Sequence, residues 1–408
     1  MILIYKTQYD IKMDTVIFGY HTYKSIGPFH NCTNIILSNH HYEDICSNNN
    51  VFVYKNVKDI FLNHKNIKQF FVMSGIETFV SLLSYNVFQE VICPSFFKYL
   101  FDKMECDVNE YDHYNIKFTL KNRDELNFVE LLENIMNKGI YKPSRNVSTK
   151  SLFGEKLYFS LQNDTFPLIT TKKTNLKHIF EELMFFLSGK TDTSLLEEKG
   201  VNVWSSNTSR AFLDSRNLQH YPEKDMGPSY SFQFRHFGAE YSTCKDVYTN
   251  GYDQLQQVIH LLKTDKFSRR IIINLWNASD IDKMALPPCG MMYQFIVTPN
   301  NELETILYQR SSDIALAGAW NIASASLFTY LLANITGLEP RGLTWMIGDV
   351  HLYENQFIEF KKYLSVQPKL FPKLYILNKK ENILDYSYGD LKLVNYEPHP
   401  FFKIPFNT

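Results

Sequence analysis

The chain has 408 residues, of which 45% are hydrophobic and 21% charged, and its 42 Lys and Arg residues nearly balance 43 Asp and Glu residues. At roughly 100–200 residues per domain, this length predicts two or three domains, with cores large enough to be stable without disulfides or metals. The balanced charge argues against dedicated nucleic-acid binding, and the 15% aromatic content argues against intrinsic disorder.

The cysteines and the N-terminus indicate a soluble intracellular protein. Six cysteines are spread along the chain without a CxxC pair, so we expect reduced thiols rather than a disulfide framework or a zinc site. The apolar run after Met1 is too short for a signal peptide, and no stretch approaches the roughly 18–20 apolar residues of a membrane span. We therefore expect a cytoplasmic location, no metal and no membrane contact.

The first third alternates short strands with helices. Apolar or β-branched runs at 15–18, 34–37, 51–54 and 69–73 predict strands, and segments 57–62 and 77–84 predict helices between them. This alternation predicts an α/β domain with a parallel or mixed sheet that helices cover on both faces.

The pattern changes near residue 122, where we place a domain boundary. Apolar residues at helical spacing predict a helix over 126–136 that ends at Gly139, and two strongly apolar helices are predicted at 176–187 and 322–336. Strands are predicted at 270–275, 293–297, 305–308 and 374–377. The proposed domains are thus residues 1–122 and 123–408.

Two segments combine nucleophilic and cationic side chains. Cys289 follows two prolines and precedes a strand, and it is either a small buried hydrophobe or, beside a cation, a thiolate. The segment 308–313 brings Arg310 together with hydroxyl and carboxyl groups, which fits a phosphate clamp and a solvated turn about equally well.

Two further groups of polar residues have open alternatives. Glu181 and Glu182 lie in a buried helix, so one of them has either a proton-transfer role or a salt bridge to Lys177 or Lys190. His351 and Tyr353 share one side of an extended segment, where they could bind a sugar hydroxyl or form an ordinary surface pair.

Taken together, long strings of the second part resemble the thymidylate synthase family. In chain order they are FPLITTKK (166–173), EELMFFLSG (181–189), GPSYSFQFRHFGAEY (227–241), SRRIIINLWN (268–277), DKMALPPC (282–289), LYQRSSD (307–313), NIAS (321–324), GDVHLYENQ (348–356) and YEPHP (396–400). The resemblance covers essentially all of residues 125–408. It implies the α+β fold of that family, with mixed sheets packed by helices and a dimer formed through a sheet face.

The resemblance also implies a reaction, the reductive methylation of dUMP to dTMP by 5,10-methylenetetrahydrofolate, which leaves as dihydrofolate. Cys289 would supply the thiolate that adds to C6 of the uracil. Glu182 would manage proton transfer at the uracil O4 and on the folate through ordered water, and Tyr230 would help to remove the C5 proton. Arg310 would lower the pKa of the thiol and bind the phosphate.

The remaining binding residues follow from the same resemblance. Arg145 and Ser311 would bind the phosphate, together with Arg269 and Arg270 of the partner subunit of a homodimer. Asn321 would read the uracil edge, Gln309 belongs to the substrate site, and His351 and Tyr353 would bind the 3′-hydroxyl. Asp313 would bind the pterin, Trp204 would pack near the folate, and Lys172 would meet its glutamate tail.

Several positions depart from the family pattern without removing a central chemical group. The loop around Arg145 lacks internal glycines, and the tail from Ile404 to Thr408 is unlike the small aliphatic ending of the family. The other departures are Asn175, Phe185, Ser205, Ser231, Gly290 and Ala317. We expect an active synthase with weaker folate affinity.

The first third resembles dihydrofolate reductase less completely. Residues 16–27 (VIFGYHTYKSIG) are similar to its cofactor-binding strand, turn and helix, and residues 71–77 (FVMSGIE) to its glycine-pair turn. The resemblance begins near residue 11, so the acidic pterin-binding residue has no counterpart, and Tyr20 and Ser74 replace a basic residue and a glycine. We expect a truncated reductase-like domain without reductase activity, for which NADPH is a doubtful cofactor. The order matches that of the bifunctional dihydrofolate reductase-thymidylate synthases.

Two other functions remain as alternatives. A pyrimidine nucleotide hydroxymethylase of the same fold would let water complete the reaction in place of hydride. A non-catalytic dimer would only bind a nucleotide or a partner, and the joint presence of Cys289, Glu182, Arg310 and Asn321 argues against it.

Overall fold

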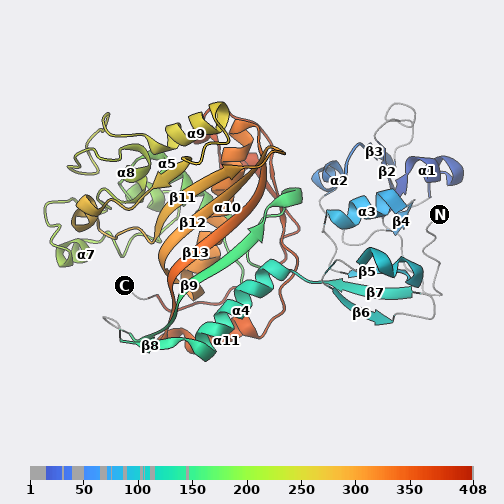
Figure 1. Cartoon of the computed structure of the whole chain (residues 1–408), viewed down its shortest axis with the longest axis horizontal. Helices are drawn as coiled ribbons and strands as arrows, with labels where there is room; N and C mark the ends of the chain where they lie inside the picture. The colour runs from blue at the N-terminus through green and yellow to red at the C-terminus, as the bar shows by residue number, and fades with distance from the viewer. Residues whose placement is uncertain are drawn as a thin grey trace. The chain divides into compact units, whose positions relative to one another are not determined.

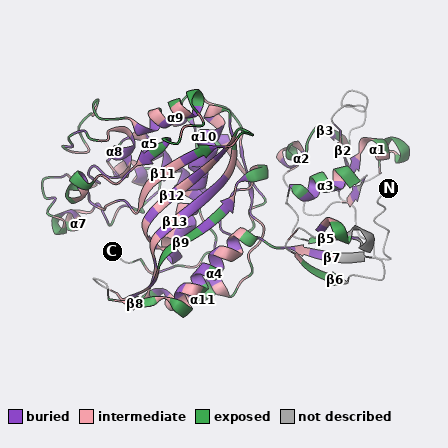
Figure 2. Cartoon of the chain, in the orientation of Figure 1, coloured by how far each residue is buried: buried purple, intermediate pink, exposed green. Residues whose placement is uncertain are grey.

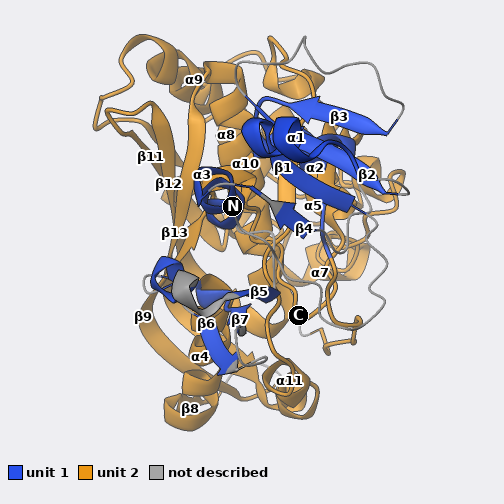
Figure 3. Ribbon diagram, turned by 90° about the vertical axis from the view of Figure 1, so that its right-hand side faces the viewer, with its two compact units in different colours: residues 1–123, 394–396 blue, residues 124–393, 397–408 orange. Residues whose placement is uncertain are grey.

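Figure 1 shows the chain as a computed structural model. The structure describes residues 15–29, 32–38, 50–64, 71–74, 76–85, 90–101, 104, 106–110, 115–143 and 147–406. Two compact units make up the chain, as Figure 3 shows in two colours. Unit 1 comprises residues 1–123 and 394–396, and unit 2 comprises residues 124–393 and 397–408.

Unit 1 contains a four-stranded parallel sheet in the order β3-β2-β1-β4. Its strands and helices are β1 (Thr15–Gly19), α1 (Tyr20–Ile26), β2 (Thr33–Leu37), β3 (Val51–Tyr54), α2 (Val57–Asn63), β4 (Phe71–Met73) and α3 (Ile76–Ser84). The strands and helices predicted for this region and their parallel pairing are confirmed, although residues 69 and 70 of the fourth run lie outside the described residues. Val16, Phe18 and Ile36 form the centre of an apolar cluster on this sheet.

A second sheet of unit 1 is antiparallel, in the order β5-β7-β6. Its strands are β5 (Glu90–Pro94), β6 (Cys106–Glu110) and β7 (Asn115–Leu120), and a short 3-10 helix, η1 (Ser95–Phe101), follows β5. The stacked rings of Phe101 and Phe118 have centroids 3.8 Å apart. The sequence analysis missed these strands, although the residues of β7 alternate between polar and apolar; β6 is largely polar.

Unit 2 is built on a six-stranded sheet in the order β10-β11-β12-β13-β9-β8. The strands are β8 (Ile140–Lys142), β9 (Thr149–Ser160), β10 (Ile272–Asn274), β11 (Gly290–Val297), β12 (Glu302–Asp313) and β13 (Glu339–Tyr353). Only β12 and β13 pair in parallel; the other neighbours are antiparallel. A further pair, β14 (Lys373–Ile376) and β15 (Leu391–Val394), forms a separate sheet. The mixed sheet expected for the second part is therefore present.

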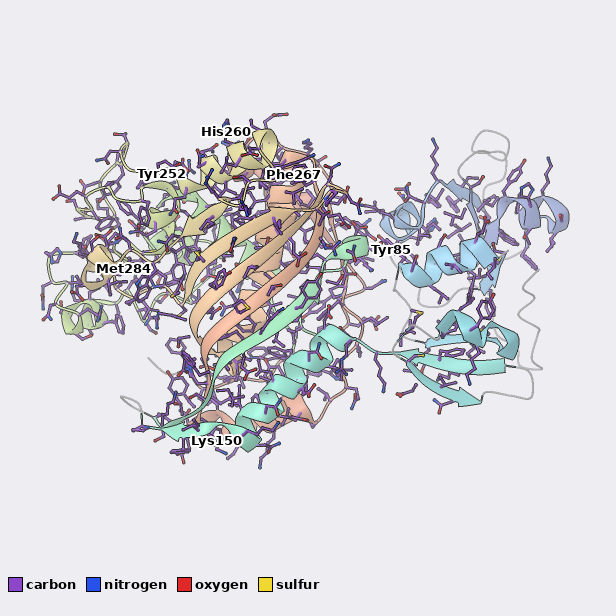
Figure 4. All side chains as sticks on the ribbon, viewed as in Figure 1. Tyr85, Lys150, Tyr252, His260, Phe267 and Met284 are labelled. Carbon is purple, nitrogen blue, oxygen red and sulfur yellow. The ribbon has the colours of Figure 1, made fainter. Side chains whose placement is uncertain are left out.

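The helices of unit 2 include those predicted from apolar periodicity. They are α4 (Arg123–Lys138), α5 (Leu176–Ser188), α6 (Ser194–Glu197), α7 (Arg210–Ser215), α8 (Tyr230–Arg235), α9 (Gln254–Thr264), α10 (Ala319–Thr336) and α11 (Phe357–Leu364). Asn175 caps α5, because its side-chain oxygen accepts from the N–H groups of Lys177 and His178. Gly189 ends α5 with φ 80°, a conformation that favours glycine. At the end of α4, Lys150 of β9 donates from Nζ to the carbonyl of Met136 (2.6 Å; Figure 4).

The long apolar helix α10 forms much of the core of unit 2. It connects the parallel strands β12 and β13 and packs against both. The segment Ile314–Thr336, which includes a preceding π-helical turn, is long and apolar enough to cross a membrane, contrary to the expectation that no stretch approaches that length. However, 78% of its apolar window is buried inside the protein, as Figure 2 illustrates, so α10 is a core helix.

A fully buried carboxyl group connects α4 to the chain segment that enters the candidate site. Glu125 Oε1 accepts from the N–H groups of Thr170 (2.8 Å) and Thr171 (2.7 Å) and from the hydroxyl of Thr171 (2.9 Å). Oε2 accepts from the Thr170 hydroxyl at 2.7 Å. Burial raises the pKa of Glu125 to about 7, although these hydrogen bonds oppose the shift.

Glu125→Gln is expected to remove a pH dependence of stability. Since the pKa of Glu125 is about 4.3 in an unfolded chain and higher in the fold, folding binds a proton, and stability falls as the pH rises from about 4.5 to about 7. The loss over that window is roughly 3 kcal/mol at most. Glutamine keeps the accepting oxygen and places an amide where a protonated carboxyl would donate to Thr170, so the variant should fold.

The measurement is the melting temperature of the wild type and of Glu125→Gln between pH 5 and pH 8. We expect the wild type to lose stability relative to the variant across this range. Parallel curves for the two proteins would contradict the assignment.

Candidate active site

Cys289 lies immediately before β11, and its backbone is held from two elements. Its N–H donates to the hydroxyl oxygen of Tyr230 on α8 (2.6 Å), and its carbonyl oxygen accepts from the N–H of Arg310 on β12 (2.8 Å). Pro287 and Pro288 restrict the chain that leads to it. The position of the sulfur is therefore fixed by the sheet and by α8.

The charge on this sulfur depends on opposing effects. Burial raises the pKa of Cys289, whereas the guanidinium of Arg310, whose Nη2 lies 3.9 Å from Sγ, and the Tyr230 side chain lower it. Because burial has the largest effect, the thiol form predominates in the free protein at neutral pH. Arg310 supplies the nearby cation that the sequence analysis required for a reactive thiol.

Arg310 is oriented by three contacts besides the sulfur. Nε donates to the carbonyl of Pro288 (2.9 Å) and Nη2 to that of Pro287 (3.1 Å). Its guanidinium carbon lies 5.5 Å from the ring centroid of Trp276. The guanidinium is thus fixed beside the nucleophile.

Glu182 on α5 has a buried carboxylate that accepts hydrogen bonds from two indoles. Trp204 Nε1 donates to Oε1 (2.8 Å), and Trp320 Nε1 donates to Oε2 (2.5 Å). Burial raises the pKa of Glu182, and both indoles act against that shift. Its neighbour Glu181 pairs with Lys199 (2.5 Å), rather than with Lys177 or Lys190.

Aromatic rings line the space between Glu182 and Cys289. Tyr230 stacks on Phe186 with ring centroids 4.8 Å apart, and Trp204 meets Tyr230 edge-on at 5.9 Å. Burial raises the pKa of Tyr230 well above its ordinary value, so its hydroxyl stays protonated at neutral pH. The hydroxyl can therefore donate a hydrogen bond to a ligand while it accepts from Cys289.

The polar residues at the end of β12 and the start of α10 differ in their burial and in their hydrogen bonds within the protein. The buried Gln309 donates from Nε2 to the carbonyl of Ser311 (2.9 Å) and accepts from Trp345 Nε1 (2.9 Å). Both ends of its amide are thus used within the protein. Ser311 is half-buried on β12, and the half-buried Asn321 follows Trp320 on α10.

His351 and Tyr353 lie on one side of β13, as their spacing predicted. Their rings meet edge-on with centroids 5.2 Å apart. His351 Nδ1 lies 2.9 Å from Oδ1 of Asp349, whose Oδ2 accepts from Lys142 Nζ (3.0 Å). This contact leaves Nε2 of His351 for another partner. The pKa of Tyr353 is raised, chiefly by burial and further by the charges of Asp313 and Cys289.

Asp313 and Lys172 form the other end of the site. Asp313 accepts from the N–H of Leu316 (3.2 Å) and from Gln356 Nε2 (2.8 Å), and burial raises its pKa. Lys172 is buried, with its ammonium 5.4–5.7 Å from the ring centroids of Tyr363, Phe401 and Phe402. Burial lowers the pKa of Lys172 to about 8, and Asp313 acts against this shift. The two residues offer an anion and a cation to a cofactor.

Three further arginines were predicted to bind the phosphate, two of them from the partner subunit. Arg145 lies outside the described residues. Arg269 and Arg270 are both exposed on the segment before β10. Among the residues that the structure describes, Arg310 is the arginine with a contact to the Cys289 sulfur.

Two departures from the resembled family, Ser231 and Ser205, form hydrogen bonds, and a third, Gly290, has little beside it. Ser231 donates to the carbonyl of Phe185 (2.9 Å) and ties α8 to α5. Ser205 donates to Glu197, which also pairs with Lys224. At Gly290, an added Cβ would meet only Leu307 Cδ1, at 3.3 Å.

The sequence analysis missed several residues that contact the site. They are Trp276 beside Arg310, Asp349 beside His351, Gln356 beside Asp313 and Trp320 beside Glu182. A signal existed for Trp320, because an indole in a buried helix requires a hydrogen-bond acceptor.

Comparisons with known proteins agree on one family. The family model described as thymidylate synthase matches residues 126–408. The thymidylate synthase of Saccharomyces cerevisiae is 43% identical over 291 residues, which are 69% of this chain and 96% of the relative. The human thymidylate synthase is 44% identical over 282 residues, 69% of this chain and 90% of the relative. The bifunctional dihydrofolate reductase-thymidylate synthase of Leishmania major is 41% identical over 291 residues, 71% of this chain but 56% of the relative.

Proposed function

The chain belongs to the thymidylate synthase family, and from this premise we propose that residues 123–408 form a domain that methylates dUMP to dTMP. The cosubstrate is 5,10-methylenetetrahydrofolate, which supplies the one-carbon unit and a hydride and leaves as dihydrofolate. The contact that carries the proposal is that of Cys289 with Arg310, at 3.9 Å, on a backbone fixed by Tyr230. This contact places a nucleophile with a fixed backbone beside a permanent cation.

Each buried group of the site has a proposed role in one step of this reaction. The Cys289 sulfur forms a bond to C6 of the uracil, and the electron pair of the C5–C6 double bond attacks the one-carbon unit from C5. Glu182 exchanges protons with the uracil O4 and the folate through water, and Tyr230 assists loss of the C5 proton. Loss of that proton breaks the bond between the one-carbon unit and the folate nitrogen and leaves a methylene group on C5. Hydride from the folate adds to this methylene, the C5–C6 double bond forms again and the Cys289 sulfur leaves C6.

The binding residues of the proposal surround the same nucleophile. Arg310, Ser311 and Arg145 bind the phosphate, Gln309 and Asn321 belong to the base and substrate site, and His351 and Tyr353 bind the 3′-hydroxyl. For the cosubstrate, Asp313 binds the pterin, Trp204 packs near it and Lys172 meets the acidic tail. The Asp349 contact supports the sugar assignment, because it leaves Nε2 of His351 available.

The experiment that tests this function is tritium release from 5-tritiated dUMP in the presence of methylenetetrahydrofolate, with dihydrofolate formation followed in parallel. Release with equimolar dihydrofolate is expected. A 5-hydroxymethyl product without dihydrofolate would instead establish the hydroxymethylase alternative, and no release would favour a binding protein.

We further propose that the enzyme is a homodimer joined through the open face of the six-stranded sheet. That face carries exposed apolar residues, including Ile272 (36% exposed) and Ile296 (56%) on the neighbouring strands β10 and β11. Exposed apolar residues on neighbouring strands of a sheet are typical of a subunit interface. Arg269 and Arg270 are exposed beside β10, and we propose that they bind the phosphate in the partner's site.

A hybrid dimer tests this arrangement. Cys289→Ala and the double variant Arg269→Ala/Arg270→Ala should each be nearly inactive alone. When the two are unfolded, mixed and refolded, hybrid dimers gain one intact site, and activity should return to about a quarter of the wild-type value, because half of the random dimers are hybrids with one site of two. Absence of recovery, with dimers present, would mean that these arginines serve their own subunit.

For residues 1–122 we propose a reductase-like domain without dihydrofolate reductase activity, in a soluble intracellular protein. The support is the incomplete resemblance, in which Tyr20 and Ser74 replace a basic residue and a glycine, together with the parallel sheet of unit 1. The test is NADPH oxidation with dihydrofolate by the purified chain, and turnover at an ordinary reductase rate would overturn the proposal.

A further inference from the structure

Trp320 makes a contact that the proposed chemistry does not use. Its Nε1 donates to Glu182 Oε2 at 2.5 Å, a shorter distance than the 2.8 Å bond from Trp204 to Oε1. The two indoles approach from different elements, Trp320 from α10 and Trp204 from the turn before α7. Each carboxylate oxygen therefore has its own donor, and the plane of the carboxylate is fixed.

The position of Trp320 in the chain links this contact to the pyrimidine site. The next residue on α10 is Asn321, to which we assign the uracil edge. A movement of this turn of α10 would displace both the residue that reads the base and the donor to Glu182. One helical turn thus orients the two groups relative to each other.

An indole N–H can only donate a hydrogen bond, so Trp320 is the donor in this contact and Glu182 is the acceptor. A donor stabilises the carboxylate anion and disfavours its protonated form. Because the group is buried, no bulk water replaces a lost donor, and the effect of the contact is larger than at a surface.

We infer that Trp320 is a positioning residue that aims the Glu182 carboxylate and favours its ionised form, so that Glu182 can accept a proton during turnover. The inference rests on the proposed function for the catalytic role of Glu182 and adds a residue to which that function gives no role.

The titratable groups near Glu182 come from three elements. Tyr293 on β11 is coupled to Glu182 by charge, and its pKa is raised by burial and by the carboxylate. Tyr230 on α8 contacts the ring of Trp204, and Cys289 is coupled to Tyr230. On α5 itself, Glu181 pairs with Lys199. Tyr293 and Tyr230 keep their protons at neutral pH, so neither tyrosine contributes to a titration below pH 8.

The first test is the dependence of kcat on pH in Trp320→Phe, which keeps an aromatic ring and removes the N–H. The apparent pKa of the acidic limb should rise by about one unit, so that kcat falls about tenfold at pH values below that pKa and recovers at higher pH. The KM for dUMP should change less than kcat. An equal loss of kcat at every pH, or an unchanged profile, would overturn the inference.

Tyr330→Phe is a matched control on the same helix. Its hydroxyl donates to the carbonyls of Leu161 (3.2 Å) and Thr165 (2.8 Å), far along α10 from Glu182. This variant also removes one buried donor, so it should lose stability without moving the pH profile. A shift as large as that of Trp320→Phe would mean that the profile reports general destabilisation.

The second test needs no variant of Trp320 and no turnover. The chain has four tryptophans, so ¹⁵N-labelled protein gives few indole N–H signals, and those of Trp204 and Trp320 should titrate with a common midpoint that Glu182→Gln abolishes. A Trp320 signal that does not move with pH would refute the inference even in an active synthase. Conversely, a shared titration without tritium release would leave this contact standing while the proposed function fails.

Discussion

Replacing Cys289 with alanine is expected to reduce tritium release from 5-tritiated dUMP by at least about 10⁴-fold, because the reaction then lacks its covalent intermediate. Exchange of the C5 hydrogen depends on addition of a nucleophile to C6, and the thiol that Arg310 contacts is the group placed for that addition. Binding of dUMP should persist in the variant, since the phosphate and sugar contacts come from other side chains.

A second cysteine in unit 2 provides the control. Burial and the charge of Asp225 raise the pKa of the Cys244 thiol to about 12, and both the thiol and the backbone N–H of Cys244 (2.7 Å) are hydrogen-bonded to Asp225. Cys244→Ala should therefore keep nearly wild-type tritium release. Activity of Cys289→Ala above about one percent of wild type would show that the nucleophile is another group.

The fold could be predicted from the sequence in those segments that have one dominant hydrophobic pattern. The stripe on α5 and the apolar run of α10 gave both helices from the sequence, because a core helix needs little beyond its own hydrophobic pattern. The sheet β5-β7-β6 was missed, although β7 alternates between polar and apolar residues, since β5 and β6 are short and β6 is largely polar. That α10 also passes a membrane-span criterion illustrates the same limit, because hydropathy alone cannot distinguish a protein core from a lipid bilayer.

The residues of the candidate site could be predicted from the sequence more readily than their arrangement in space. Motifs named Cys289 and Arg310, but their contact arises from the register of the antiparallel strands β11 and β12, in which Gly290 pairs with Gln309. Local patterns do not fix such a register. Trp320 escaped notice for a related reason: in a helix buried on nearly every side, the sequence does not reveal which neighbour an indole faces.

Replacing Arg310 should have the second-largest effect, with turnover lowered about 10²–10³-fold in Arg310→Gln. The guanidinium opposes the rise in pKa that burial causes at Cys289, so its removal must raise that pKa further. Below this pKa, each unit of increase lowers the thiolate fraction tenfold. The rate at which iodoacetamide alkylates Cys289, followed at that residue by mass spectrometry, should therefore fall near neutral pH and approach the wild-type rate only at a higher pH.

Two variants separate charge from geometry in this prediction. Arg310→Lys keeps a cation, so the alkylation profile should shift less than in Arg310→Gln, while the KM for dUMP rises because lysine lacks the planar fork that holds a phosphate. Arg210→Gln is the matched control, because Arg210 also donates to two carbonyls, those of Leu218 (3.0 Å) and Tyr221 (2.6 Å), and belongs to no proposed site. If Arg310→Gln and Arg210→Gln both leave the alkylation profile at its wild-type pH, Arg310 does not tune the thiol, and its function is restricted to binding the substrate.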